Sequence, residues 1–83
     1  MANVKNLLAD LIALPSVNPA FLPPRHPQAG EGRVAEYLAA LGARAGLDIE
    51  FQPVLPHRPN LLACLRPVGR VRRTILLAPH LDT

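Results

Sequence analysis

Apolar residues near the start of the chain recur at helical spacing. The apolar positions between Asn3 and Pro15 are three or four residues apart along one stripe: Val4, Leu7, Leu8, Leu11, Ile12 and Leu14. This stripe predicts an amphipathic helix from Asn3 to about Leu14, and Asn3 stands where an N-cap residue accepts backbone hydrogen bonds. Pro15 disfavours helical backbone at Leu14 and ends the helix. The stripe needs a surface to pack on, and one face of a β-sheet is the simplest.

A second helix is expected after a proline-rich loop. Residues 15–30 contain five of the ten prolines and show no periodicity, which predicts an irregular, stiffened loop. Helical periodicity returns from about Gly30 to Ala45, and Gly46 follows in position for a left-handed C-cap. The expected buried stripe of this helix is Val34, Tyr37, Leu38, Leu41 and Ala45.

The second half of the chain has the patterns of strands. Residues 47–52 alternate with period two and predict a strand with one solvated face, and Pro53 indicates that the strand ends there or lies at a sheet edge. Residues 60–66 are nearly all apolar, and a last strand from about Val71 or Arg72 ends in the apolar run 75–78. A short turn at residues 67–70 predicts that these last two strands form a hairpin. The expected fold is α/β, in the order helix, helix, strand, strand, strand.

Two polar residues follow the last predicted strand. His80 and Asp82 are two apart, so in extended backbone they project from the same side. A carboxylate beside an imidazole accepts the proton of one ring nitrogen and leaves the other nitrogen for a metal ion or a proton transfer. A solvated surface turn is the alternative interpretation of His-x-Asp. The buried strand in front of the pair favours a site, because ligands in α/β folds gather at strand ends.

Composition limits the kinds of protein to consider. A lone domain of 83 residues buries only about 60% of the surface of its unfolded chain, yet 49% of these residues are hydrophobic. This suits a piece of a larger α/β enzyme. The single cysteine, Cys64, is expected to be a small buried hydrophobe. No run approaches the ~18 apolar residues of a membrane span, and Asp10 interrupts the only stretch resembling a signal peptide, so we expect a cytoplasmic protein without a membrane partner.

The basic residues gather around one predicted turn. The net charge is +3, and the cluster consists of Arg66, Arg70, Arg72 and Arg73. A nucleic-acid-binding hairpin is one hypothesis, but no aromatic residue is interleaved for base stacking. A solvated hairpin tip is the favoured interpretation, and no nucleic-acid partner is expected.

The motifs, taken in order, resemble a known family. The first helix ends in L-P-S-V-N-P, G-E-G-R-V-A-E-Y-L opens the second, and R-P-N-L-L-A precedes a strand that runs into P-H-L-D-T. This is similar to the N-terminal portion of the co-catalytic zinc aminoacyl hydrolases and exopeptidases, which include acetylornithine deacetylase, succinyl-diaminopimelate desuccinylase, carboxypeptidase G and aminoacylase. The resemblance implies that residues 1–83 are the N-terminal portion of a catalytic domain with a helix-flanked mixed β-sheet, incomplete without the later catalytic and dimerisation domains.

The resemblance also implies roles for particular residues. His80 matches the family's first zinc ligand, Asp82 matches the carboxylate that orients this histidine, and Asn60 matches a recurring structural asparagine. In the family, two zinc ions, for which cobalt is a possible substitute, activate a water that attacks an amide of an N-acylated amino acid or small peptide. The bridging aspartate, the second histidine and the general-base glutamate of the family would all follow Thr83. His26 and His57 match no ligand position.

Two other expectations accompany the resemblance. The family implies a homodimer formed through a later domain, and the choice among acyl groups and amino acids depends on residues beyond Thr83.

A hypothesis of a different class is a small non-catalytic α/β binding or assembly module, in which His-x-Asp is incidental.

Overall fold

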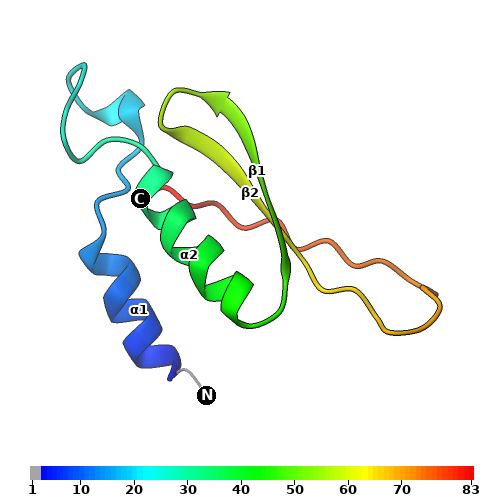
Figure 1. Cartoon of the computed structure of the whole chain (residues 1–83). Helices are drawn as coiled ribbons and strands as arrows, with labels where there is room; N and C mark the ends of the chain where they lie inside the picture. The colour runs from blue at the N-terminus through cyan, green and yellow to red at the C-terminus, as the bar shows by residue number, and fades with distance from the viewer. Residues whose placement is uncertain (1–2) are drawn as a thin grey trace.

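Two helices precede a two-stranded antiparallel hairpin in the computed structural model, which describes residues 3–83 (Figure 1). The elements are α1 (Val4–Ala13), the short 3-10 helix η1 (Pro19–Phe21), α2 (Gly32–Arg44), β1 (Asp48–Leu55) and β2 (Arg58–Cys64). The predicted order is therefore confirmed as far as the second strand. Neither described α-helix has the length and apolar character needed to cross a membrane.

Helix α1 begins and ends where the sequence predicts. The Asn3 side chain accepts hydrogen bonds from the backbone N–H groups of Lys5 and Asn6, at 2.8 and 3.4 Å. The expectation that its apolar stripe packs on a sheet is wrong, because no residue of α1 is buried and Ile12 is 74% exposed. Instead α1 lies beside α2, where the Tyr37 hydroxyl donates to Asp10 at 2.8 Å (Figure 1).

Helix α2 carries the small core of the described chain. Its buried residues are Val34, Ala35, Ala39 and Gly42, while the predicted Tyr37, Leu38 and Leu41 are only half-buried and Ala45 is exposed. The hairpin approaches the small residues closely. A Cβ atom added at Gly42 would lie 2.9 Å from Ile49 Cδ1. The buried positions of α2 are therefore mostly small residues, which allow the hairpin to approach closely. A search for the periodicity of large apolar residues does not find such positions.

The hairpin joins β1 to β2, not β2 to a third strand as predicted. Phe51 pairs with Leu61 and Pro53 with Pro59, so β1 does not end at Pro53 and is instead an edge strand of the two-stranded sheet, the other alternative that this proline indicates. The reversal takes only Pro56 and His57, because His57 adopts a left-handed φ of 60°. A proline followed by a positive φ is the pattern of a type II turn. Non-glycine residues seldom adopt this conformation, so no signal in the sequence indicated a turn this short.

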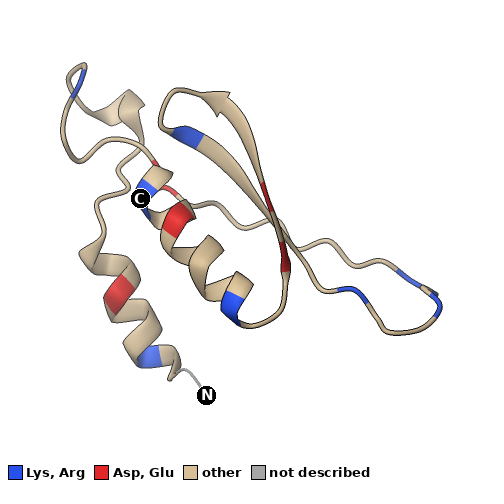
Figure 2. Cartoon of the chain, in the orientation of Figure 1, with Lys and Arg blue, Asp and Glu red and all other residues tan. Residues whose placement is uncertain are grey.

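The predicted third strand is wrong, since residues 65–83 form neither helix nor strand. After Cys64 the chain swings out to a tip that carries the arginines and returns past the hairpin to the start of α2 (Figures 1 and 2). Ile75, Leu76 and Leu77 are each at least 80% exposed. A strand requires a neighbour at about 4.8 Å along its length, and the apolar run does not have one among the described residues. Cys64, expected to be buried, is exposed at the end of β2.

The proline-rich loop is organised by its own backbone. Val17 and Ala29 form a parallel bridge, in which the Val17 N–H donates to Gln28 at 3.0 Å and the Gly30 N–H donates to Val17 at 2.9 Å. The Arg33 guanidinium donates to the carbonyl groups of Pro15 and Pro27, one on each arm of the loop. Residues 15–30 are thus held as a closed loop above the start of α2.

Gly30 is expected to tolerate no side chain. Its φ is +96°, and an added Cβ would lie 2.9 Å from the His57 carbonyl oxygen, whereas Gly46 has a φ of +89° and open space around it. Gly46→Ala should therefore lower the free energy of unfolding by about 1–3 kcal/mol through backbone strain alone. Gly30→Ala should lower it further, because the clash adds to the same strain. Urea denaturation followed by circular dichroism measures both losses. Equal losses would contradict the prediction, because they would mean that the turn at His57 shifts to accommodate the added Cβ.

The contact between α1 and α2 should weaken in alkali. The hydrogen bond to Asp10 is the main reason that the pKa of Tyr37 lies above its usual value of 10.0. Because the folded-state pKa is raised, this contribution to stability is complete below pH 10 and is lost as the pH rises through the folded-state value. Tyr37 is the only tyrosine. Its ultraviolet absorbance therefore reports the ionisation, and the protection of the α1 amides, taken relative to their base-catalysed intrinsic exchange rates, should fall with it. A Tyr37→Phe variant should show fast α1 exchange already at neutral pH.

Candidate functional site

The end of the described chain is fixed by backbone hydrogen bonds to the proline-rich loop. The Thr83 N–H donates to the Ser16 carbonyl at 3.0 Å, and the Asn18 N–H donates to the Thr83 carbonyl at 3.2 Å. Residues 16–18 therefore lie between Thr83 on one side and residues 28–30 on the other. Ser16 is 2% exposed at the centre of this arrangement. The bonds give His80 and Asp82 a defined place although the preceding residues are exposed.

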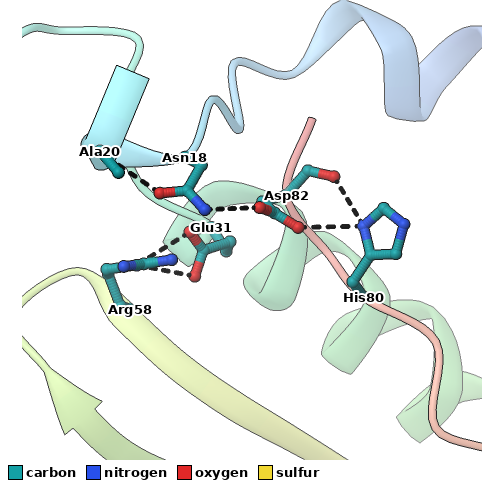
Figure 3. A network of polar contacts seen from close by, with 6 residues as sticks. All are labelled: Asn18, Ala20, Glu31, Arg58, His80 and Asp82. Atoms are coloured by element: carbon teal, nitrogen blue, oxygen red, sulfur yellow. Dashed lines mark hydrogen bonds and ion pairs between the residues drawn. The ribbon is translucent and has the colours of Figure 1, made fainter. Parts of the chain in front are cut away.

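The structure brings His80 and Asp82 together. His80 Nδ1 lies 2.9 Å from Asp82 Oδ1 and 3.0 Å from the Asp82 backbone oxygen. Neither a carbonyl oxygen nor an ionised carboxylate has a proton to give, so Nδ1 must be the donor. In a neutral imidazole the lone pair is then on Nε2, which faces away from Asp82 (Figure 3). His80 therefore offers its free ring nitrogen to an incoming group.

Asn18 holds the other oxygen of the Asp82 carboxylate. Its Nδ2 donates to Asp82 Oδ2 at 2.9 Å, while its Oδ1 accepts from the Ala20 N–H at 2.9 Å (Figure 3). The hydrogen bond from Asn18 is the largest reason that the pKa of Asp82 lies below its usual value. Burial, the next largest effect, acts in the opposite direction, and the hydrogen bond and charge of His80 lower the pKa further. Asp82 is accordingly ionised at neutral pH.

His80 and Asp82 lie beside an open cleft. A cavity of about 770 Å³ separates the chain around His80 and Asp82 from α2 and the hairpin, with Leu38 and Leu61 among its apolar lining. Arg58, on the same wall, binds Glu31 through Nε, at 3.1 and 3.2 Å from the two carboxylate oxygens. This ion pair connects the start of β2 to the residue that precedes α2, and so fixes the hairpin wall of the cleft.

The described residues do not complete a zinc site by themselves. Among residues 3–83 no group of three or more His, Cys, Asp or Glu side chains is placed to hold a metal ion, whereas a protein zinc site takes at least three ligands. His26 and His57 line a different cavity of about 530 Å³, next to Arg25 and Arg33. His80 thus offers a single, well-oriented nitrogen.

Asn18 is the residue of this site to which the sequence assigned no role, although it lies within the L-P-S-V-N-P motif. It stands 64 residues from Asp82, and no spacing pattern connects positions so distant. The Asn-Pro pair at residues 18–19 indicates a turn or helix cap, and the Oδ1 atom of Asn18 does cap η1. No pattern in the sequence indicated that Nδ2 of the same amide would donate to Asp82.

Comparison of the chain with protein-family models, with curated proteins and with solved structures found no match.

Two histidines are expected to show opposite tautomers. His80 Nδ1 faces only acceptors, so its neutral ring should be protonated at Nδ1. His26 Nδ1 accepts from the Gln28 N–H at 3.1 Å, so its neutral ring should be protonated at Nε2. Long-range proton–nitrogen NMR correlation above about pH 7.5, where ordinary imidazoles are neutral, distinguishes the two forms. A protonated Nε2 on His80 would contradict the assigned geometry.

Proposed function

We propose that this chain is the N-terminal portion of the catalytic domain of a zinc-dependent hydrolase that cleaves the amide bond of an N-acylated amino acid or small peptide. The observation that carries the proposal is the free Nε2 of His80, which the Asp82 carboxylate orients beside a cleft. His80 would be one metal ligand and Asp82 its orienting partner. The remaining ligands and the general base would come from later residues.

The pair has the chemistry that such a ligand needs. A histidine that binds a metal usually donates its second ring N–H to a carboxylate, which fixes the tautomer and increases the basicity of the coordinating nitrogen. Asp82 occupies that position, and its lowered pKa keeps it ionised as a proton acceptor. Zinc, when bound, would act as a Lewis acid and lower the pKa of a bound water. The residues described here would orient the ligand and hold its Nδ1 proton.

The exposed apolar run supports the proposal that further parts of a domain follow. Ile75, Leu76 and Leu77 are at least 80% exposed, and burying such side chains contributes about 1.5–3 kcal/mol each. Further strands of a mixed sheet would cover them. In the proposed enzyme a separate later domain would form a homodimer, and the substrate would be a small molecule.

The proposal is tested on the protein encoded by the whole reading frame. The frame beyond Thr83 should supply a bridging aspartate, a pair of glutamates and a second histidine. The purified protein should contain zinc and hydrolyse N-acylated amino acids. His80→Ala should abolish both properties, and Asp82→Asn should lower metal affinity about 10–100-fold, as loss of a ligand's hydrogen-bond partner usually does.

The matched control is His26→Ala, which removes an imidazole whose ring is bonded to the Gln28 N–H within the proline-rich loop. Its zinc content and rate should equal those of the wild type. A frame that lacks further carboxylates and histidine, or an unchanged zinc content in His80→Ala, would contradict the proposal. A cooperatively folding protein whose thermal melt is indifferent to zinc would favour the non-catalytic module instead.

A further inference from the structure

We propose that Asn18 is a positioning residue for this site, holding the Asp82 carboxylate in the orientation in which it fixes His80. The inference rests on the proposed function for its consequence in metal binding, but its structural content concerns only the contact chain from Asn18 through Asp82 to His80. Asn18 would not touch the metal or the substrate. It would act on the proposed metal ligand, His80, only through Asp82.

The hydrogen-bond partners of the Asn18 side chain allow only one orientation of its amide. Its Oδ1 accepts from the Ala20 N–H at 2.9 Å, and a backbone N–H can only donate. Nδ2 must therefore be on the opposite side, where it lies 2.9 Å from Asp82 Oδ2. The oxygen and nitrogen of the amide are assigned by their partners, and the donor is aimed at the carboxylate before any ligand arrives.

The Asp82 carboxylate is held at both ends. Oδ2 accepts from Asn18 and Oδ1 accepts from His80 Nδ1 at 2.9 Å, so the two bonds together fix both the position and the plane of the group (Figure 3). His80 itself is exposed, with 85% of its side chain accessible, and packing does little to hold its ring. The orientation of the ring therefore depends on a carboxylate that cannot rotate freely.

The backbone supports the same contact. The Thr83 N–H and carbonyl bond to residues 16 and 18, at 3.0 and 3.2 Å, which sets the register of Asp82 against Asn18. Asn18 is half-buried, and its next residue, Pro19, opens η1. The residue is thus anchored on its own side by the cap of η1 and on the other side by the bridge to Thr83.

Three substitutions separate the positioning role from the capping role. Asn18→Ala removes both hydrogen bonds of the amide. Asn18→Asp and Asn18→Ser keep an oxygen that can accept from the Ala20 N–H, but neither offers a donor at the position of Nδ2, and the serine variant adds no charge. Asn6→Ala, on the exposed surface of α1, is the matched control for loss of an asparagine side chain.

The readouts are the Asp82 χ1 rotamer populations from three-bond couplings and the His80 tautomer, measured by NMR in the 83-residue chain at one fixed pH. All three Asn18 variants should spread Asp82 over several rotamers and raise the fraction of His80 protonated at Nε2, while Asn6→Ala stays as the wild type. In the protein of the whole reading frame, the same three variants should lower zinc affinity by about tenfold.

Wild-type couplings and tautomer in Asn18→Asp and Asn18→Ser, with loss only in Asn18→Ala, would assign Asn18 a capping role alone and overturn the inference. Unchanged values in all three variants would overturn it as well. If the wild-type protein of the whole frame does not bind zinc at His80, the proposed function fails, and the couplings in the 83-residue chain still decide whether Asn18 holds Asp82.

Discussion

The backbone bridge at residues 16–18 is the constraint on which the rest of the site depends. These residues bond to Gln28 and Gly30 on one side and to Thr83 on the other, with distances from 2.9 to 3.2 Å. Inter-strand bonds of this kind fix register, because a shift by one residue would turn every side chain to the opposite face. Asn18 and Asp82 face each other for this reason. Without the bridge, an exposed chain end would have no preferred partner.

The hairpin and α2 provide the platform for this bridge with little buried volume. The core consists of Val34, Ala35 and Ala39, and Gly42 permits Ile49 to approach the helix closely. Such a core stabilises the fold through close contacts between the helix and the hairpin more than through a large buried apolar area. Much of the remaining organisation comes from polar links: Arg33 to the loop carbonyls, Arg58 to the mostly buried Glu31, and Tyr37 to Asp10.

Local signals in the sequence were sufficient for local structure. The cap at Asn3, the stop at Pro15 and the helical periodicity located both helices, and the spacing of two put His80 and Asp82 on one side. The pairing of strands was not accessible, because it depended on His57 adopting a left-handed φ of 60°. The apolar run 75–78 indicated a need for burial, but a run of apolar residues does not specify which neighbour supplies it. Asn18 was missed because its partner is 64 residues away.

That separation also sets the order in which the molecule can be assembled. The contacts between α2 and the hairpin join residues close in sequence, so the entropy of closing their loops is small and they can form early. The contact of Asn18 with Asp82 closes a loop that spans most of the chain. During synthesis from the N-terminus it must wait until residue 82 has been made and has left the ribosome. The His80 ring can therefore acquire its fixed orientation only after the residues of α2 and the hairpin have been made.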